Sequence, residues 1–221
     1  MPIKLYKLDL SPPARAAMMA FELFNVPVEF INVDLGSKKH LTPEFVQKNP
    51  LHSVPFFEDG DLIIHDSHAI LMYMADKYGK TDEFYPKDVK QRALVNQILF
   101  FDTAILFPRL RNVTYPAFFE NKKTVTQNQI NDIDEAYGFL EQFLTRTKYL
   151  AGDHITIADV SAIANVSSLI YLLPLDKSKY PKTLAWMKDM ENQSYCKKYN
   201  EQGAIGIGNF IKHFDFSNIK K

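Results

Sequence analysis

The sequence has little of what several classes of protein require. It has one cysteine, Cys196, among 221 residues, which excludes an internal disulfide framework or a metal site of several thiolates and fits a reducing compartment. Its 26 Lys and Arg residues balance 26 Asp and Glu residues, so no nucleic-acid partner is expected. No uncharged apolar run reaches the roughly 18 residues of a membrane span, and the first residues lack the basic and apolar regions of a signal peptide. We therefore expect a cytoplasmic, globular protein with no membrane association.

Familiar catalytic motifs are also missing. No Gly-x-Gly-x-x-Gly motif follows the first predicted strand, and there is neither a Gly-x-Ser-x-Gly nucleophile elbow nor a His-Glu-x-x-His zinc pair. His65 and His68 straddle a predicted helix start, so they would not share one helical face. Gly203, Gly206 and Gly208 follow the predicted helices and are expected to form turns. Dinucleotide binding, serine hydrolysis and metal chemistry are therefore disfavoured.

The first 80 residues show the alternation of strands and helices that is typical of a small α/β unit. A strand is predicted near residues 3–6 and another over 28–33. Between them, Ser11-Pro12-Pro13 provides the N-cap and early prolines of a helix over 12–24. Because this helix must cross over between the two strands, we expect the strands to be parallel.

The rest of this unit is predicted to be a short helix, a hairpin and a last helix. Thr42-Pro43-Glu44 repeats the cap-and-proline pattern, and Asp59-Gly60 predicts a type I′ turn between two short strands. Asp66-Ser67 then caps a helix that ends near Gly79. The predicted order is β-α-β-α-β-β-α.

Beyond a polar linker at residues 80–90, the pattern is helical throughout. A long helix from about Leu94 is expected to be interrupted at Pro108 and to end near Tyr115-Pro116. Thr156-Ile157-Ala158-Asp159 resembles a capping box, with Asp in place of Glu or Gln, and Tyr180-Pro181 opens the last clear helix. The chain is therefore predicted to be a small α/β domain over residues 1–80 followed by an all-α domain over 88–221.

Two serines occupy positions that favour an anionic ligand. Ser11 and Ser67 each stand at the N-terminus of a helix that follows a strand, where free N–H groups and the helix dipole favour negative charge. For either serine alone, a simple helix cap is the better explanation. Two such ends in one small sheet, with Val54-Pro55 between them in sequence, favour a peptide-like anionic ligand.

An ordered series of motifs supports a family resemblance over nearly the whole length. The motifs are Ser11-Pro12-Pro13-Ala14-Arg15-Ala16, Asn49-Pro50-Leu51-His52-Ser53-Val54-Pro55, Glu58-Asp59-Gly60, Asp66-Ser67-His68-Ala69-Ile70, Tyr85-Pro86-Lys87, Leu150-Ala151-Gly152-Asp153 and Thr156-Ile157-Ala158-Asp159. The chain resembles cytosolic glutathione transferases, most of all the insect epsilon class of the delta/epsilon group. The resemblance implies a thioredoxin-like glutathione-binding domain, an all-helical domain that supplies a hydrophobic pocket, a homodimer, and glutathione as co-substrate without a metal.

The resemblance also implies a role for particular residues. Ser11 would stabilise the glutathione thiolate, a cis Val54-Pro55 bond would present backbone to the cysteinyl part, and Asp66-Ser67 would hold the γ-glutamyl end. The glutathione-binding residues that it implies are His40, His52, Ser53, Val54, Pro55, Asp66, Ser67 and His68. The residues expected to line the electrophile pocket are Pro13, Leu35, Phe107, Leu110, Arg111, Tyr115 and Phe118. Arg111 is the exception to an apolar lining: it would either attract an anionic group or face solvent.

Two alternatives bear on the mechanism. Other transferase classes use a tyrosine near the end of the first strand, and Tyr6 is one position away from where that tyrosine would be. A shift of one residue in a strand turns the side chain to the other face, so a structural role is expected for Tyr6. The main hypothesis is a transferase that conjugates glutathione to small hydrophobic electrophiles in detoxification, with peroxidase or dehydrohalogenase side activities known in the family. The alternative hypothesis is a non-catalytic carrier of hydrophobic ligands.

Overall fold

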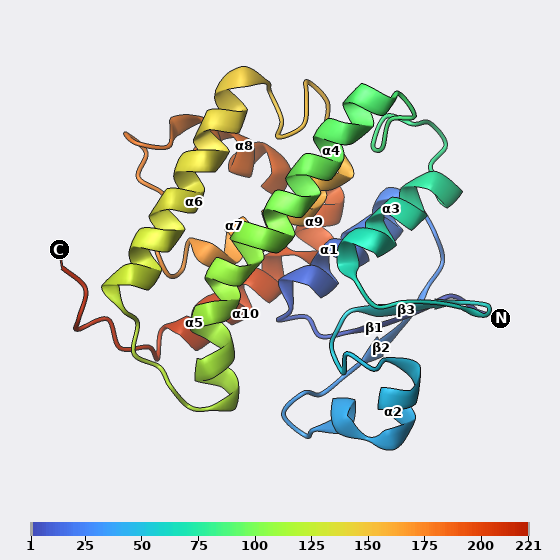
Figure 1. Cartoon of the computed structure of the whole chain (residues 1–221), viewed down its shortest axis with the longest axis horizontal. Helices are drawn as coiled ribbons and strands as arrows, with labels where there is room; N and C mark the ends of the chain where they lie inside the picture. Colours follow the sequence, from blue (N-terminus) through green and yellow to red (C-terminus); the bar gives the residue numbers. More distant parts are fainter. Residues whose placement is uncertain (1, 221) are drawn as a thin grey trace.

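A four-stranded mixed sheet organises the N-terminal part of the computed structural model, which describes residues 2–220 (Figure 1). The strands are β1 (Lys4–Lys7), β2 (Glu29–Asn32), β3 (Phe56–Asp59) and β4 (Leu62–Ile64). Their order in the sheet is β2-β1-β3-β4. β1 and β2 are parallel, as predicted, and β3 is antiparallel to both β1 and β4.

Helices cover both faces of this sheet. α1 (Pro12–Leu23) and α3 (Ser67–Tyr78) pack together on one face, and α2 (Pro43–Lys48) lies on the other (Figure 1). A short 3-10 turn, η1 (Lys39–Leu41), precedes α2. This is the thioredoxin-like arrangement that the resemblance implied. The connection between β1 and α1 and the start of α3 both carry predicted site residues.

The hairpin between β3 and β4 differs in detail from the prediction. The register pairs Asp59 with Leu62, so Gly60 and Asp61 are the two central residues. Of these only Gly60 has a positive φ, at 67°. A type I′ turn needs positive φ at both central residues, whereas a type II′ turn needs it only at the first. The type I′ prediction is therefore wrong, and the turn follows the type II′ pattern.

The remainder of the chain is helical, as predicted. Its helices are α4 (Val89–Phe101), α5 (Phe107–Phe119), α6 (Gln127–Arg146), α7 (Ile157–Leu169), α8 (Pro181–Glu191), α9 (Ser194–Tyr199) and α10 (Glu201–Ile211). α7 is buried along its whole length and contacts α1, α4, α8 and α10. The predicted capping box is present: Asp159 accepts hydrogen bonds from the Thr156 N–H and hydroxyl at 2.9 and 3.2 Å. Asp159 is fully buried and also accepts the Trp186 indole N–H at 2.9 Å.

The long helix after the linker does not end where the sequence suggested. A π-helical segment, η2 (Asp102–Leu106), joins α4 to α5, and Pro108, which has no N–H to donate to the preceding turn, stands two residues after the end of this segment. Pro116 lies inside α5, which runs on to Phe119. Within the described residues 2–220, only this continuous helix has the length and apolar composition of a membrane span, and it packs here against α6 and α7.

The glycine-rich C-terminal segment was predicted as turns and forms α10 instead. A Cβ at position 203 would collide with the Asp9 carbonyl and the Arg15 side chain. The glycine therefore lets α10 approach the connection between β1 and α1. The sequence pattern did not predict this helix, because a contact with residues 9 and 15, far away in the chain, leaves no signal in local periodicity.

Candidate functional site

A cavity of about 380 Å³ lies between the sheet domain and the helical domain. The predicted site residues that line it from the sheet domain are Ser11, Leu35, His40, His52, Ser53 and Val54. Those that line it from α5 are Phe107, Leu110, Arg111, Tyr115 and Phe118. Predicted site residues more than 100 positions apart in the sequence therefore meet at one place.

Ser11 stands at the junction of β1 and α1 and faces this cavity. It has the extended backbone of an N-cap, with φ −80° and ψ 114°, and its hydroxyl oxygen accepts the Ala14 N–H at 3.4 Å. Within residues 2–220 the hydroxyl donates no hydrogen bond of its own. Because Pro12 and Pro13 have no N–H, the hydroxyl is the main donor at the start of this helix. The geometry suits a hydrogen bond from Ser11 to a negatively charged atom in the cavity.

The loop before β3 presents backbone groups to the same space. The Val54-Pro55 peptide bond is cis. Among residues 2–220 the backbone N–H and C=O of Val54 have no hydrogen-bond partner. The fully buried Asn49 supports the loop, since its amide donates to the Ser53 carbonyl at 2.7 Å and its oxygen accepts the Leu51 N–H at 3.0 Å. Asn49 belongs to one of the family motifs, but this role in supporting the loop was not predicted from the sequence.

Asp66 and Ser67 lie at the N-terminus of α3, outside the residues that line the cavity. The Asp66 carboxylate accepts the His68 and Ala69 N–H groups at 2.9 and 3.0 Å. The contact with the His68 ring and these backbone hydrogen bonds outweigh partial burial and lower the pKa of Asp66. The carboxylate is therefore ionised at neutral pH and remains accessible to a ligand amine. Pro13 and Pro55 do not line the cavity either.

His68 turns toward the helical domain. Its Nε2 lies 2.9 Å from Asp102 Oδ2, while Nδ1 is 3.4 Å from Asp66 Oδ1, an ion contact rather than a well-formed hydrogen bond. Asp102 is fully buried and also accepts the Ser161 hydroxyl at 2.6 Å and the Asn165 amide at 2.8 Å. Burial alone would lower the pKa of His68, but the bonds to Asp102 and Asp66 outweigh it and raise the pKa to about 9. His68 is therefore a cation that joins the two domains.

His40, which lines the cavity beside His52, is neutral by contrast. The His40 and His52 ring centres are 6.4 Å apart. Burial, and then the proximity of His52, lower the pKa of His40. The Nδ1 atom of His40 is buried without a hydrogen-bond partner among residues 2–220. A ligand carboxylate at this place would supply a hydrogen-bond acceptor for the His40 ring.

The cavity has an aromatic wall that was only partly predicted. Phe119 lies beside Tyr115 and Phe118, with ring centres 4.6 and 4.9 Å apart, and Phe210 of α10 lies 5.9 Å from Phe118. Phe119 also lies 6.3 Å from the His40 ring across the domain boundary. Phe119 and Phe210 were missed because α5 was expected to end earlier and α10 was not expected at all.

Tyr6 belongs to a different environment. Its ring stacks on Phe56 at 3.9 Å, and its hydroxyl bonds to Glu58 at 3.3 Å and to Lys48 at 3.2 Å. It does not line the cavity that contains Ser11. This geometry agrees with the structural role expected for Tyr6.

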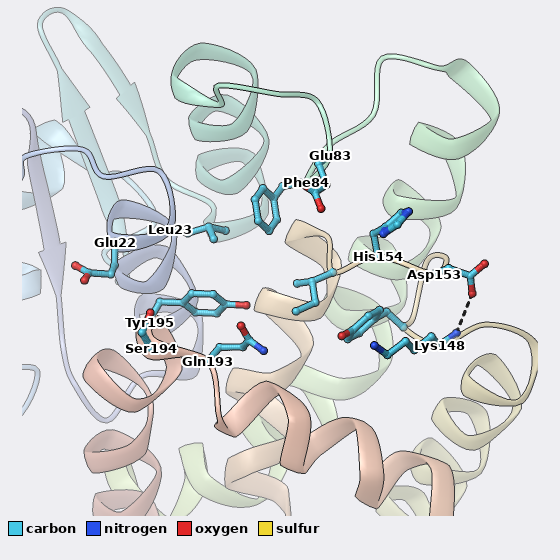
Figure 2. Close-up of a pocket in the computed structure, with 12 residues that line it drawn as sticks. Glu22, Leu23, Glu83, Phe84, Lys148, Asp153, His154, Gln193, Ser194 and Tyr195 are labelled. Carbon is cyan, nitrogen blue, oxygen red and sulfur yellow. Dashed lines mark hydrogen bonds between the residues drawn. The ribbon is translucent and has the colours of Figure 1, made fainter.

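A second cavity, of about 450 Å³, lies between the end of α1, the linker and the start of α9 (Figure 2). Figure 2 shows Glu22 and Leu23 on one side, Glu83 and Phe84 above, and Asp153 with Lys148 on the far side. None of the predicted site residues lines it. Because its carboxylates outnumber its lysine, this cavity suits an anionic peptide less well than the Ser11 cavity does. Within residues 2–220, no three His, Cys, Asp or Glu side chains are placed to hold a metal ion.

Comparison with known proteins decides the family. The model "Glutathione S-transferase, N-terminal domain" matches residues 1–76, and the model "Glutathione S-transferase, C-terminal domain" matches residues 72–194. The chain belongs to the glutathione S-transferase family. This transferase is 42% identical over 205 residues to "Glutathione S-transferase 1" of Manduca sexta, covering 92% of this chain and 94% of the relative.

Solved structures agree with this assignment. An epsilon-class glutathione S-transferase from the housefly, Musca domestica, superposes with a TM-score of 0.94 at 43% identity, covering 97% of this chain and 100% of that one. A glutathione transferase homologue from Drosophila mojavensis with bound glutathione gives 0.94 at 40% identity, covering 97% and 98%. The expected resemblance to insect epsilon-class transferases is therefore confirmed, and the chain is a glutathione transferase.

Proposed function

We propose that this transferase conjugates glutathione to small hydrophobic electrophiles and that the Ser11 hydroxyl stabilises the attacking thiolate. The observation that carries the proposal is the position of Ser11. Its hydroxyl faces the cavity, donates to no other group among residues 2–220, and stands at a helix start that lacks its first N–H groups. The relative from Drosophila mojavensis, which has bound glutathione, supports glutathione as the co-substrate.

The energy needed to form the thiolate matches what this arrangement can provide. A free thiol of this kind has a pKa of roughly 8.5, so making the thiolate predominant at neutral pH requires about 2.7 kcal/mol. A hydrogen bond to a charged group contributes about 1.5–3 kcal/mol, and a helix N-terminus adds about 0.3–1 kcal/mol. A serine hydroxyl at the start of α1 therefore suffices without a general base.

The surrounding residues suit the rest of the tripeptide. Asp66 would pair with the ligand's amine, and Ser67 at the N-terminus of α3 would hold its α-carboxylate. The unpartnered backbone of Val54, supported by Ser53 and the cis Pro55, would pair with the cysteinyl part. His40 and His52 would receive the glycyl carboxylate. His68 would act through Asp66, which it holds, rather than by direct contact.

The reaction then takes place against the α5 wall. The thiolate sulfur forms a bond to the electrophilic carbon, the leaving group departs with its electron pair, and the thiol proton passes to solvent. Leu35 and the apolar and aromatic residues of α5 would hold the electrophile beside the sulfur. Pro13 follows Pro12, which lines the cavity, but does not line the cavity itself and has no contact role in this arrangement.

Several broader features belong to the same proposal. We place the glutathione-binding domain at residues 1–80 and the acceptor-binding domain at 88–221, in a cytoplasmic enzyme of detoxification. We also propose a homodimer. Val89 and Phe100, which lie on one face of α4, are 80% and 64% exposed, and a second copy of the chain would cover them.

Ser11→Ala tests the proposal. The variant should keep glutathione binding, raise the pKa of the bound thiol, and lower turnover at neutral pH by at least about tenfold, which corresponds to 1.36 kcal/mol. The measurement is a pH titration of thiolate ultraviolet absorbance in the bound complex, with Tyr6→Phe as the matched control that should leave the midpoint unchanged. Coincident midpoints for Ser11→Ala and the unmodified enzyme would reduce Ser11 to a helix cap. Glutathione binding without turnover of a generic aromatic halide would instead favour the carrier alternative.

A further inference from the structure

Arg109 and Arg111 are two residues apart on α5 and have very different surroundings. The guanidinium of Arg109 makes ion pairs with Asp132 and Glu135 of α6, both at 2.8 Å. Arg111 makes no ion pair with any of residues 2–220. Its guanidinium carbon lies 4.1 Å from the centre of the Tyr115 ring, one turn along the helix, and the side chain lines the Ser11 cavity. Arg109 therefore stabilises the packing of α5 against α6, whereas Arg111 is a cation in the cavity wall without an ion-pair partner among residues 2–220.

The charges around the cavity leave this cation without a counterion. Not one Asp or Glu residue is among the described residues that line it. Its other basic groups are His40 and His52, which lie on the sheet-domain side where the glycyl carboxylate is placed by the proposed function. Arg111 is on the opposite, helical side, where the electrophile would bind. An anionic group on the electrophile would therefore meet attraction there and no repelling carboxylate.

The neighbouring surface suits a flat ligand. Tyr115, Phe118 and Phe119 line the cavity and are 40%, 41% and 44% exposed, so their faces are open to a ligand. Stacking on Tyr115 also orients the Arg111 guanidinium, which reduces the entropy lost when its N–H groups bind a carboxylate. Aromatic rings and an ordered guanidinium together recognise an aromatic acid.

We propose that the acceptor site selects aromatic electrophiles that carry a carboxylate remote from the reacting carbon, with Arg111 as the specificity-determining residue. This inference rests on the proposed function, since it concerns the electrophile of that reaction. With a benzylic chloride as the electrophile, the glutathione sulfur forms a C–S bond at the benzylic carbon. The C–Cl bond breaks, chloride leaves with the electron pair, and the thiol proton goes to solvent. Arg111 touches only the carboxylate and takes no part in bond making.

A matched pair of acceptors provides the first test. 4-(Chloromethyl)benzoate and its methyl ester share the reacting group and most of their shape, but only the first is charged. The value of kcat/KM for each is divided by its uncatalysed rate with glutathione. This corrected kcat/KM should be about tenfold higher for the carboxylate than for the ester. Added salt should reduce the ratio because Arg111 is exposed.

Substitutions assign the preference to one residue. Arg111→Met, which keeps an unbranched apolar side chain but removes the charge, should bring the ratio close to one. Arg111→Glu should invert it. Arg109→Met is the matched control: it removes a charge from the same helix but should leave the ratio unchanged. A preference that survives in Arg111→Met, or one that is absent from the unmodified enzyme while the ester is conjugated, would overturn the inference and leave the proposed function standing.

A binding measurement separates the inference from catalysis. Isothermal titration with S-(4-carboxybenzyl)glutathione and with its methyl ester needs no turnover. The acid should bind about tenfold more tightly than the ester to the unmodified enzyme, and equally to Arg111→Met. If this result were obtained while neither acceptor was conjugated, Arg111 would select carboxylate ligands in a carrier, and the proposed function and the inference about electrophiles would both be overturned. Equal affinities in the unmodified enzyme would overturn the inference.

Discussion

Replacing His68 with glutamine should remove a large part of the pH dependence of this enzyme's stability. The imidazole of His68 lies against the buried Asp102, which raises the pKa of His68 from the ordinary 6.5 to about 9. In the folded state the ring therefore keeps its proton through neutral pH. In the unfolded chain it loses that proton near pH 6.5.

The sign and size of the effect follow from this difference. Because the folded pKa is the higher one, the stabilisation is fully present below pH 6.5 and is lost as the pH rises toward 9. A pKa of about 9 against 6.5 corresponds to about 3 kcal/mol of unfolding free energy. The loss is steepest between these values, at up to about 1.4 kcal/mol per pH unit. Between pH 7 and pH 8.5 the unmodified enzyme should lose about 2 kcal/mol more than His68→Gln does.

The assay is urea unfolding at a fixed protein concentration across pH 6–9, for both proteins. Glutamine can still donate a hydrogen bond to Asp102, so the variant should fold and lose only the titration. His213→Gln is the control, because His213 is exposed and forms no ion pair with any of residues 2–220. Asp102→Asn should reduce the same pH dependence, because it removes the buried carboxylate beside His68 and leaves only Asp66. Parallel pH profiles for the unmodified enzyme and His68→Gln would refute the charge link between the domains.

Two further predictions concern glutathione affinity and helix packing. Asp66→Asn should raise KM for glutathione more than it lowers kcat, since the pair with the ligand's amine exists in both ground and transition states. Steady-state kinetics measure this, and an unchanged KM would contradict the role of Asp66; Asp66→Ala should in addition lose about 1 kcal/mol of stability with its helix cap. Gly203→Ala should destabilise the enzyme by about 1–3 kcal/mol through collision with Asp9 and Arg15, whereas Gly138→Ala, where a Cβ meets nothing within 4 Å, should stabilise it by up to about 1 kcal/mol. Thermal unfolding measures both, and equal shifts would contradict the packing argument.

Local signals explain why much of the fold could be predicted. Ser11, Thr42, Asp66 and Thr156 each cap a helix with their own side chain. The polar stretch after Tyr78 separates the alternating strands and helices of the first domain from the all-helical pattern of the second. Such caps act within three or four residues, so a single sequence displays them. The failures had long-range causes. α5 continues past Pro116, and the glycine-rich segment forms α10, whose close approach to residue 9 requires glycine at position 203.

The candidate site divides along the same line. Ser11 and the Val54-Pro55 bond are identified by motifs, and the structure places them at one cavity. Nothing local predicts that His68 turns to Asp102, a residue 34 positions away in a π-helical segment. Phe210 likewise reaches the aromatic wall only because α10 returns to the sheet domain. Contacts of this kind depend on how the domains meet, which sequence periodicity does not encode.

Arg15 shows how closely the position of Ser11 depends on that meeting of domains. Its five N–H donors are all used: Asn200 at 2.8 Å, the carbonyls of Asp9 and Leu10 at 3.3 and 3.2 Å, and the Ala164 carbonyl and Ser168 hydroxyl of α7 at 2.8 and 2.6 Å.

The guanidinium of Arg15 is fully buried, and burial lowers its pKa to about 9, so it remains charged at neutral pH without a carboxylate partner. A buried charge of this kind is tolerable only when its donors are satisfied. The acceptors include the two residues immediately before Ser11 and, in the other domain, two residues of α7 and Asn200, which lies between α9 and α10. The helical domain therefore does more than supply an acceptor pocket: through Arg15 it also holds the backbone that aims the Ser11 hydroxyl into the cavity.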